Sequence, residues 1–221
     1  MSSLTNKLRM AGYVDHILTE RQIASILNGS DARRYALVNR ALKDGSLTRL
    51  KRGLYALGLS QRSAPLHPFA IAQAILPGSY ISMETALSYH GWIPEAVYET
   101  ISITPRRKTL TYQHEQFGQF RYAPLAHNKY QFLQSVSREK IGAQMVLIAN
   151  PLRALLDLVA HRKKDWTHID WIEQSLRIEL THLANLKSKD FKSLDLVYKH
   201  KRVRMFLQEL KNETERMREK A

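Results

Sequence analysis

The spacing of apolar and polar positions predicts three short helices followed by a hairpin at the start of the chain. A first helix can begin at Ser2 or Ser3, since serine is a favourable N-cap. The second, residues 19–27, has apolar side chains at helical spacing and opens with the Thr-x-x-Gln pattern of a capping box. The third follows the N-cap Ser30 and ends at Gly45, because glycine accepts the left-handed backbone that stops a helix.

The third helix is amphipathic, with a basic face opposite its apolar face. At about 100° per residue, the apolar face that we expect to pack in the core consists of Tyr35, Val38, Ala41 and Leu42. A cationic face with small and apolar residues between the charges suits a helix in the major groove of DNA. The basic face consists of Arg33, Ala36, Arg40 and Lys43, with Leu37 and Asn39 on its flanks.

A basic hairpin follows this helix and completes the pattern of a winged helix-turn-helix. Residues 47–57 read as two strands, and Lys51, Arg52 and Gly53 form the turn between them. A turn of this kind can meet DNA phosphates as a wing. The alternative is a solvated charged helix beside an ordinary surface hairpin. The order of helix, glycine stop and basic hairpin favours the DNA-binding interpretation.

The rest of the chain predicts a mixed α/β domain and a helical C-terminal region, so that the whole is expected to be α+β. We expect a winged-helix domain in residues 1–59, a polar linker with prolines in 60–68, and the mixed domain in 69–165. Residues 166–221 are helical in pattern, and the polar last dozen residues are expected to be frayed or disordered. The strands of the mixed domain are predicted at 80–82, 100–104, 110–113, 119–122 and 145–149, with helices at 69–76, 83–90 and after Asn150.

Charge and cysteine content narrow the function classes. The formal net charge is +14 and the pI is near 10.0, which suggests a polyanionic partner or an anionic surface. The net charges of residues 1–60, 61–165 and 166–221 are +6, +5 and +3, so the excess is densest around the predicted basic helix and hairpin. The chain has no cysteine, which excludes disulfides and thiolate metal sites. We expect a cytoplasmic protein without a membrane partner, because no signal peptide and no long apolar run is present.

Four separated blocks of the sequence resemble the AbiEi family, antitoxins of bacterial abortive-infection (type IV toxin-antitoxin) systems. Residues 47–57 (LTRLKRGLYAL) are similar to the wing of that family. Residues 80–104 (YISMETALSYHGWIPEAVYETISIT), 117–125 (FGQFRYAPL) and 149–159 (ANPLRALLDLV) are similar to its second domain. The blocks occur in the expected order between residues 15 and 162.

The resemblance implies a repressor and antitoxin, with an N-terminal winged helix and a mixed C-terminal domain. Such proteins bind inverted repeats in their own promoter, which suggests a homodimer on double-stranded DNA, and counter a nucleotidyltransferase-type toxin. By position, the resemblance implies that the DNA-binding residues are Arg33, Arg34, Leu37 and Arg40 on the helix and Arg49, Lys51, Arg52 and Gly53 in the wing. Tyr55 also matches the family pattern, and we expect it to pack rather than to contact DNA.

No constellation of residues points to catalysis, a cofactor or a metal. His161 and His168 lie near Asp157, Asp165 and Asp170 in sequence, but their spacing matches no ligand motif, and solvated helix ends explain them. A nucleic-acid-processing enzyme with a winged-helix targeting domain remains an alternative, as does a winged-helix regulator that senses a small molecule. The cluster Arg106, Arg107 and Lys108 is either a solvated turn or a second polyanion contact.

Overall fold

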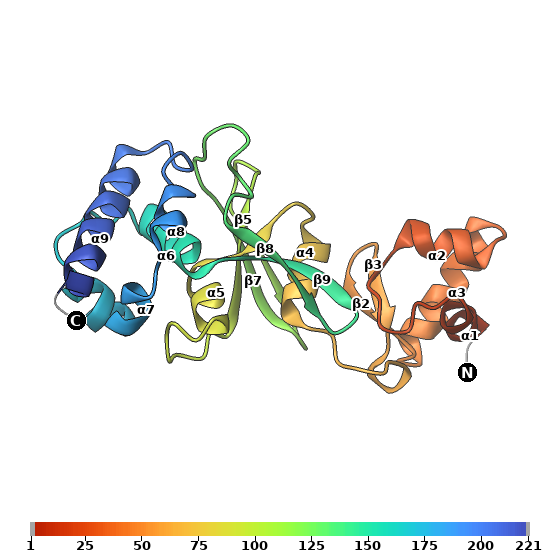
Figure 1. Ribbon diagram of the computed structural model, residues 1–221. Coiled ribbons are helices and arrows are strands. Elements are labelled where there is room, and N and C mark those ends of the chain that lie inside the picture. The colour runs from red at the N-terminus through yellow and green to blue at the C-terminus, as the bar shows by residue number, and fades with distance from the viewer. Residues whose placement is uncertain (1–2, 220–221) are drawn as a thin grey trace. The chain divides into compact units, whose positions relative to one another are not determined.

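The computed structural model describes residues 3–219 and has the expected α+β composition (Figure 1). Two compact units divide the chain. The first unit runs up to Pro77 and includes Lys140–Val146, and the second comprises Gly78–Glu139 and the residues from Leu147 onward. The first division therefore falls after the 60–68 segment that the sequence suggested as a linker. The expected helix start at Ser2 lies outside the described residues.

The first unit consists mainly of helices around a small antiparallel sheet. Its sheet has the strand order β1-β3-β2, and β1 pairs with β3 through Leu18 and Thr19, a strand that the sequence pattern did not indicate. The elements in chain order are α1 (Ser3–Met10), β1 (Leu18–Thr19), α2 (Glu20–Leu27), α3 (Asp31–Lys43), β2 (Leu47–Lys51), β3 (Leu54–Leu57), a 3-10 turn (Leu59–Gln61) and α4 (Pro68–Ile75).

The predicted caps of α2 and α3 are confirmed. The Gln22 N–H donates to Thr19 Oγ1 at 3.3 Å, and the Thr19 N–H donates to Gln22 Oε1 at 2.8 Å, which completes the capping box. Ser30 Oγ accepts from the Arg33 N–H at 3.4 Å. Gly45 has a φ of 72°, a left-handed conformation that glycine adopts without strain after the helix. Local sequence therefore fixes where these two helices begin and where the chain turns after α3.

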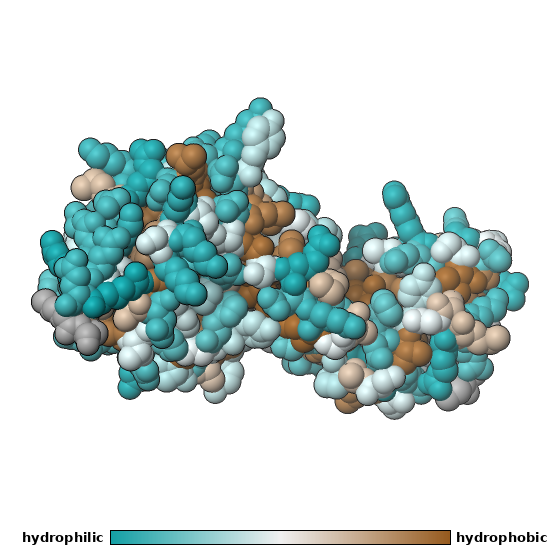
Figure 2. Space-filling view, in the orientation of Figure 1, coloured by the Kyte–Doolittle hydropathy of each residue, from teal (hydrophilic) through white to brown (hydrophobic). Residues whose placement is uncertain are grey.

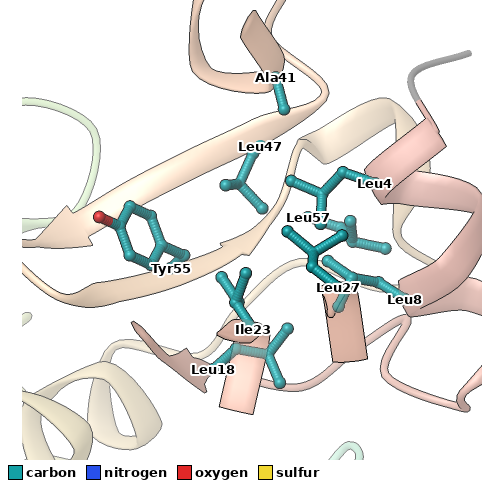
Figure 3. Close-up of a cluster of buried hydrophobic side chains, with 9 residues drawn as sticks. All are labelled: Leu4, Leu8, Leu18, Ile23, Leu27, Ala41, Leu47, Tyr55 and Leu57. Atoms are coloured by element: carbon teal, nitrogen blue, oxygen red, sulfur yellow. The ribbon is translucent and has the colours of Figure 1, made fainter. Parts of the chain in front are cut away.

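One apolar core joins the helices and the hairpin of the first unit (Figure 3). The buried side chains come from α1, α2 and α3 and from all three strands, and they are Leu4, Leu8, Leu18, Ile23, Leu27, Ala41, Leu47, Tyr55 and Leu57. The expectation that Tyr35 belongs to this core is wrong, because its side chain is 70% exposed. Tyr35 lies about 120° around α3 from the buried Ala41, so the apolar face is narrower than the sequence suggested. Leu37 packs against the core instead.

A six-stranded mixed sheet with the order β6-β7-β5-β4-β9-β8 forms the largest sheet of the described chain. Strands β5 and β7 pair in parallel, as do β4 and β9, whereas β4 with β5 and β6 with β7 are antiparallel. The apolar β9 is an interior strand, and the edge strand β8 escaped prediction because three of its residues are charged. The strands are β4 (Tyr80–Ile81), β5 (Glu99–Thr104), β6 (Leu110–His114), β7 (Gly118–Pro124), β8 (Val136–Ile141) and β9 (Gln144–Ala149).

The helices of the second unit include one that reaches the end of the described chain. The predicted frayed tail is wrong for the described residues, because α9 remains helical to Glu219. An amphipathic face explains this, since Phe206, Leu210 and Thr214 are buried and the Arg218 Nε donates to Ala184 O at 2.9 Å. The helices are α5 (Met83–Tyr89), α6 (Pro151–Arg162), a π-helix (Trp171–Ser175), α7 (Leu180–Ala184), α8 (Ser188–Lys192) and α9 (Lys201–Glu219).

A buried ion pair on α6 organises the polar interior of the second unit. Arg153 Nε lies 3.1 Å from Asp157 Oδ1, and both side chains are fully buried. The hydroxyls of Tyr80 and Ser82 donate to Asp157 Oδ2 at 2.8 and 2.7 Å, and Tyr198 donates to Oδ1 at 2.7 Å. Both carboxylate oxygens are thereby satisfied by groups from three separate parts of the chain. The network fixes β4, the start of α5 and the segment after α8 relative to α6.

The same contacts set the charge states of the network. Burial by itself would raise the pKa of Asp157, but attraction to the Arg153 guanidinium and neighbouring side-chain donors hold that pKa at about 2. Burial raises the pKa of Tyr80 and Tyr198 well above the usual value, so both phenols stay protonated and donate. The expectation of a solvated helix end is wrong for Asp157, because its side chain is fully buried in this network.

A first prediction concerns the contribution of the buried core of the first unit to the free energy of unfolding. Leu57 is fully buried, whereas Leu59, two residues later, is 69% exposed. Leu57→Ala should lower the free energy of unfolding by about 2–5 kcal/mol, because it removes buried methylenes and leaves a cavity. Leu59→Ala is the matched control and should change it by less than about 0.5 kcal/mol. Chemical denaturation of the full chain measures both, and equal effects would contradict the described core.

The buried carboxylate makes a second prediction, about pH. A carboxylate whose pKa is lowered in the folded state stabilises the protein above its unfolded pKa, and this contribution is lost as the pH falls through the folded pKa. Asp157→Asn should lower the free energy of unfolding by about 3–5 kcal/mol at neutral pH, because it leaves Arg153 buried without its counter-ion. The gap between wild type and variant should narrow by about 2 kcal/mol between about pH 5 and pH 2.

Urea denaturation across this pH range tests the second prediction. Asp195→Asn, at an exposed position, is the control and should leave the pH dependence unchanged. A wild-type to Asp157→Asn difference that stays constant from neutral to acid pH would show that the carboxylate is not held in its ionised form.

Candidate nucleic-acid interface

A cleft of about 870 Å3 opens between α2, α3 and the β2–β3 hairpin. Four arginines and two carboxylates line it, together with apolar and amide side chains, so its charge favours a polyanion. The lining residues are Glu20, Arg21, Ile23 and Ala24 from α2, Asp31, Ala32, Arg34, Tyr35, Val38 and Asn39 from α3, and Arg49, Arg52 and Tyr55 from the hairpin.

Two of the four arginines are unpaired, and a backbone hydrogen bond joins the segments that carry them. Within residues 3–219, Arg21 and Arg52 have no carboxylate or hydrogen-bond partner. Their sequence neighbours Glu20 and Gly53 are joined by a backbone bond from Glu20 N–H to Gly53 O of 3.0 Å, which brings the two cationic segments together. Two arginines that line one cleft without an ion-pair partner favour an anionic ligand.

The other two arginines are held by local contacts. Arg34 forms an ion pair with Asp31 and also donates to the carbonyl oxygen of Gly29. The guanidinium of Arg49 lies 6.0 Å from the centroid of the Tyr55 ring, its cross-strand partner. These contacts fix the walls of the cleft and leave less of their charge available to a ligand.

A β-bulge and a glycine give the hairpin its tight turn. The register shifts between Arg49 and Lys51, and this bulge lets Leu50 point into the interior, where it is fully buried. Gly53 closes the turn with a φ of 77°, which strongly favours glycine. Arg52 therefore projects at the tip, beside the start of α2.

The structure distributes the expected α3 residues over two edges of the helix. Of the helix residues expected to bind DNA, only Arg34 lines the cleft. Arg33, Arg40 and Lys43 are exposed on the edge that does not line it. Leu37 is partly buried against the core of the first unit. The basic face of α3 and the edge of α3 that lines the cleft are thus different sides of the helix.

The expected hairpin residues are also divided. Arg49 and Arg52 line the cleft, whereas the Lys51 ammonium donates to the carbonyl oxygen of Ile75 at 3.4 Å. Lys51 therefore contacts α4 within the first unit. Tyr55 is 7% exposed and belongs to the core, as expected for a packing residue.

The lining residues that were not foreseen as site residues include Arg21, Tyr35 and Asn39. Tyr35 was assigned to the core and Asn39 only to a flank of the basic face. Tyr35 and Asn39 are four residues apart, and Ala32 comes three residues before Tyr35. This spacing places Ala32, Tyr35 and Asn39 on one edge of a helix. This spacing could have indicated from the sequence that these residues share one edge of α3. Arg21 carries no such signal, because only the folded hairpin brings it close to Arg52.

The second unit has basic and acidic groups, but several of its carboxylates are already paired with arginines. Arg121 binds Glu99 at 2.9 Å and Arg162 binds Glu84 at 2.6 Å. Burial, followed by the nearby Arg121, lowers the pKa of His161, which favours its neutral form. Among residues 3–219 no three acidic or histidine side chains lie close enough to hold a metal ion. The cluster of Arg106, Arg107 and Lys108 is exposed in the turn before β6.

Neither the scan of protein-family models nor the search of curated proteins finds a match to the chain. No helix within the described residues combines the length and apolar character needed to cross a membrane. On the face shown in Figure 2, hydrophilic side chains cover most of the surface and the hydrophobic ones gather in small separate patches.

Proposed function

We propose that the first unit is a winged helix-turn-helix that binds double-stranded DNA, and that the chain is a repressor and antitoxin of the AbiEi type. The observation that carries the DNA-binding part is the cleft, in which Arg21 and Arg52 have no counter-ion among the described residues. A surface that keeps unpaired arginines beside an exposed helix suits a phosphate backbone better than a neutral ligand.

The arrangement of elements supports the winged-helix part of the proposal. Helices α2 and α3 are separated by three residues, 28–30, and the hairpin of β2 and β3 follows directly. Strand β1 pairs with β3 and so closes a three-stranded sheet beside the helices. In this geometry α3 would enter the major groove while the hairpin lies on a flanking phosphate.

The proposed binding would be mainly electrostatic in affinity. Each phosphate that an arginine neutralises releases condensed counter-ions, and affinity then depends steeply on salt. A dimer on DNA would place two α3 helices on the halves of an inverted repeat, as symmetric operators require. The protein would repress transcription by occupying the promoter of its own operon.

The antitoxin part rests on the resemblance of the second unit to the AbiEi family. The blocks at 80–104 and 149–159 contain Tyr80, Arg153 and Asp157, which form the buried network. The resemblance therefore includes residues that hold this unit together. The proposed partner is a nucleotidyltransferase-like toxin, and localisation in the cytoplasm follows from binding cellular DNA.

A third prediction concerns the unpaired arginines. Arg21→Ala and Arg52→Ala should each weaken binding to a duplex of the upstream promoter. Each should also reduce the slope of log affinity against log salt by about 0.9 for every phosphate that is no longer neutralised. Arg138→Ala, an exposed arginine on β8, is the matched control and should leave the slope unchanged. Fluorescence anisotropy at several salt concentrations measures the slopes. Equal slopes for all four proteins would remove these residues from the DNA interface.

A fourth prediction tests the antitoxin part in cells. Co-expression with the neighbouring nucleotidyltransferase-like gene should restore growth when wild-type protein is supplied from an unrelated promoter. The double variant Arg21→Ala, Arg52→Ala should lose repression of a reporter fused to the native promoter yet still protect against the toxin. Failure of the wild-type protein to protect would refute the antitoxin function, and loss of protection only in the stable double variant would show that it requires DNA binding.

A further inference from the structure

Helix α3 has two exposed edges, and they differ in chemistry. The cleft edge includes Ala32, Tyr35 and Asn39, beside the cleft-lining Asp31, Arg34 and Val38, and the outer edge consists of Arg33, Arg40 and Lys43. At about 100° per residue, the midpoint of Tyr35 and Asn39 lies roughly 130° around the helix from that of Arg33 and Arg40. A helix that enters a DNA groove can present only one of these pairs to the base edges. The edge that contacts the bases therefore determines which DNA sequence is recognised.

The cleft edge has side chains that the rest of the protein does not use. Tyr35 is 70% exposed and Asn39 is half-buried. Within residues 3–219 neither side chain has a hydrogen-bond or ring partner. An amide and a phenol that are held in a cleft without partners can satisfy themselves on a ligand.

The surrounding charges orient the same edge toward DNA. Arg21 and Arg52 line the same cleft as Tyr35 and Asn39, so phosphates bound by these arginines would bring the adjoining groove close to this edge of α3. Arg33 and Arg40 do not line the cleft. A helix that enters the groove by its cleft edge would therefore keep Arg21 and Arg52 nearer to the phosphates than one that enters by its outer edge.

We propose that Tyr35 and Asn39 determine the base sequence that the protein recognises, and that the outer edge with Arg33 and Arg40 does not contact base edges. The inference rests on the proposed binding of double-stranded DNA. It reverses the assignment that the basic stripe of α3 suggested from sequence.

The chemistry of the two side chains indicates what they read. An asparagine amide can form two bonds with one adenine in the major groove, because its NH2 donates to N7 while its oxygen accepts from the N6 amino group. The Tyr35 ring offers an apolar face to a thymine methyl group. Because four residues of helix rise by about 6 Å and base pairs by about 3.4 Å, the two positions should be at most about two base pairs apart. The expected recognition element is therefore a short A·T-containing step.

Selection from a library of duplexes with a randomised core, followed by sequencing, tests the inference on the full chain. Asn39→Ala should reduce the preference for adenine at one position by roughly tenfold or more, and Tyr35→Ala should relax an adjacent position. Arg33→Ala and Arg40→Ala are matched controls on the other edge and should keep the wild-type consensus. Thermal unfolding of each variant verifies that it is folded, which is expected for Tyr35→Ala because Tyr35 is exposed.

The outcomes separate the inference from the function on which it rests. A consensus that survives in Tyr35→Ala and Asn39→Ala but relaxes in Arg33→Ala or Arg40→Ala would overturn the inference and leave DNA binding intact. Binding of duplexes by the wild-type protein without any sequence preference would also overturn the inference and leave DNA binding intact. Failure of the wild-type protein to retain duplexes from the library at low salt would refute both. An altered fold in the Asn39→Ala variant is addressed by Asn39→Asp, which should shift preference away from adenine toward cytosine.

Discussion

The cleft exists because one small apolar core holds its three walls in place. Ile23 and Leu27 anchor α2, Ala41 anchors α3, and Leu47 and Leu57 anchor the hairpin (Figure 3). No wall is connected to another by a disulfide, because the chain has no cysteine. Burial of apolar area is therefore the main force that keeps the start of α2 beside the hairpin turn. A change in the packing of this core would move the charges of the cleft, so the proposed binding of DNA should depend on the stability of the first unit.

The second unit depends on a different constraint, a buried ion pair that is fully hydrogen-bonded. Such a pair contributes little net stability compared with an apolar replacement, but removing one member leaves an uncompensated charge. Arg153 and Asp157 on α6 are met by the hydroxyls of Tyr80 and Tyr198, which are remote in sequence. Because these hydroxyls come from distant segments, the network constrains how β4, α6 and the segment after α8 pack together.

The sequence by itself determined the local elements of this protein. The capping box at Thr19, the N-cap at Ser30 and the stop at Gly45 depend on neighbouring residues alone, and so the sequence pattern could predict them. The alternating and apolar runs likewise indicated β5 and β9, and together with the predicted helices they indicated the α+β class. The polar end of α9 was predicted wrongly, because its few buried residues gain their stability from packing on other helices.

Only the tertiary structure decided which side chains share a site. The phase of α3 relative to the core exposed Tyr35 and turned it to the cleft, and the periodicity could not fix that phase because the apolar and charged positions overlap along the helix. The proximity of Arg21 and Arg52 depends on a backbone bond between Glu20 and Gly53, and the bond of Lys51 to Ile75 depends on α4. These contacts join residues far apart in sequence, so they follow from the folded core and not from any local pattern.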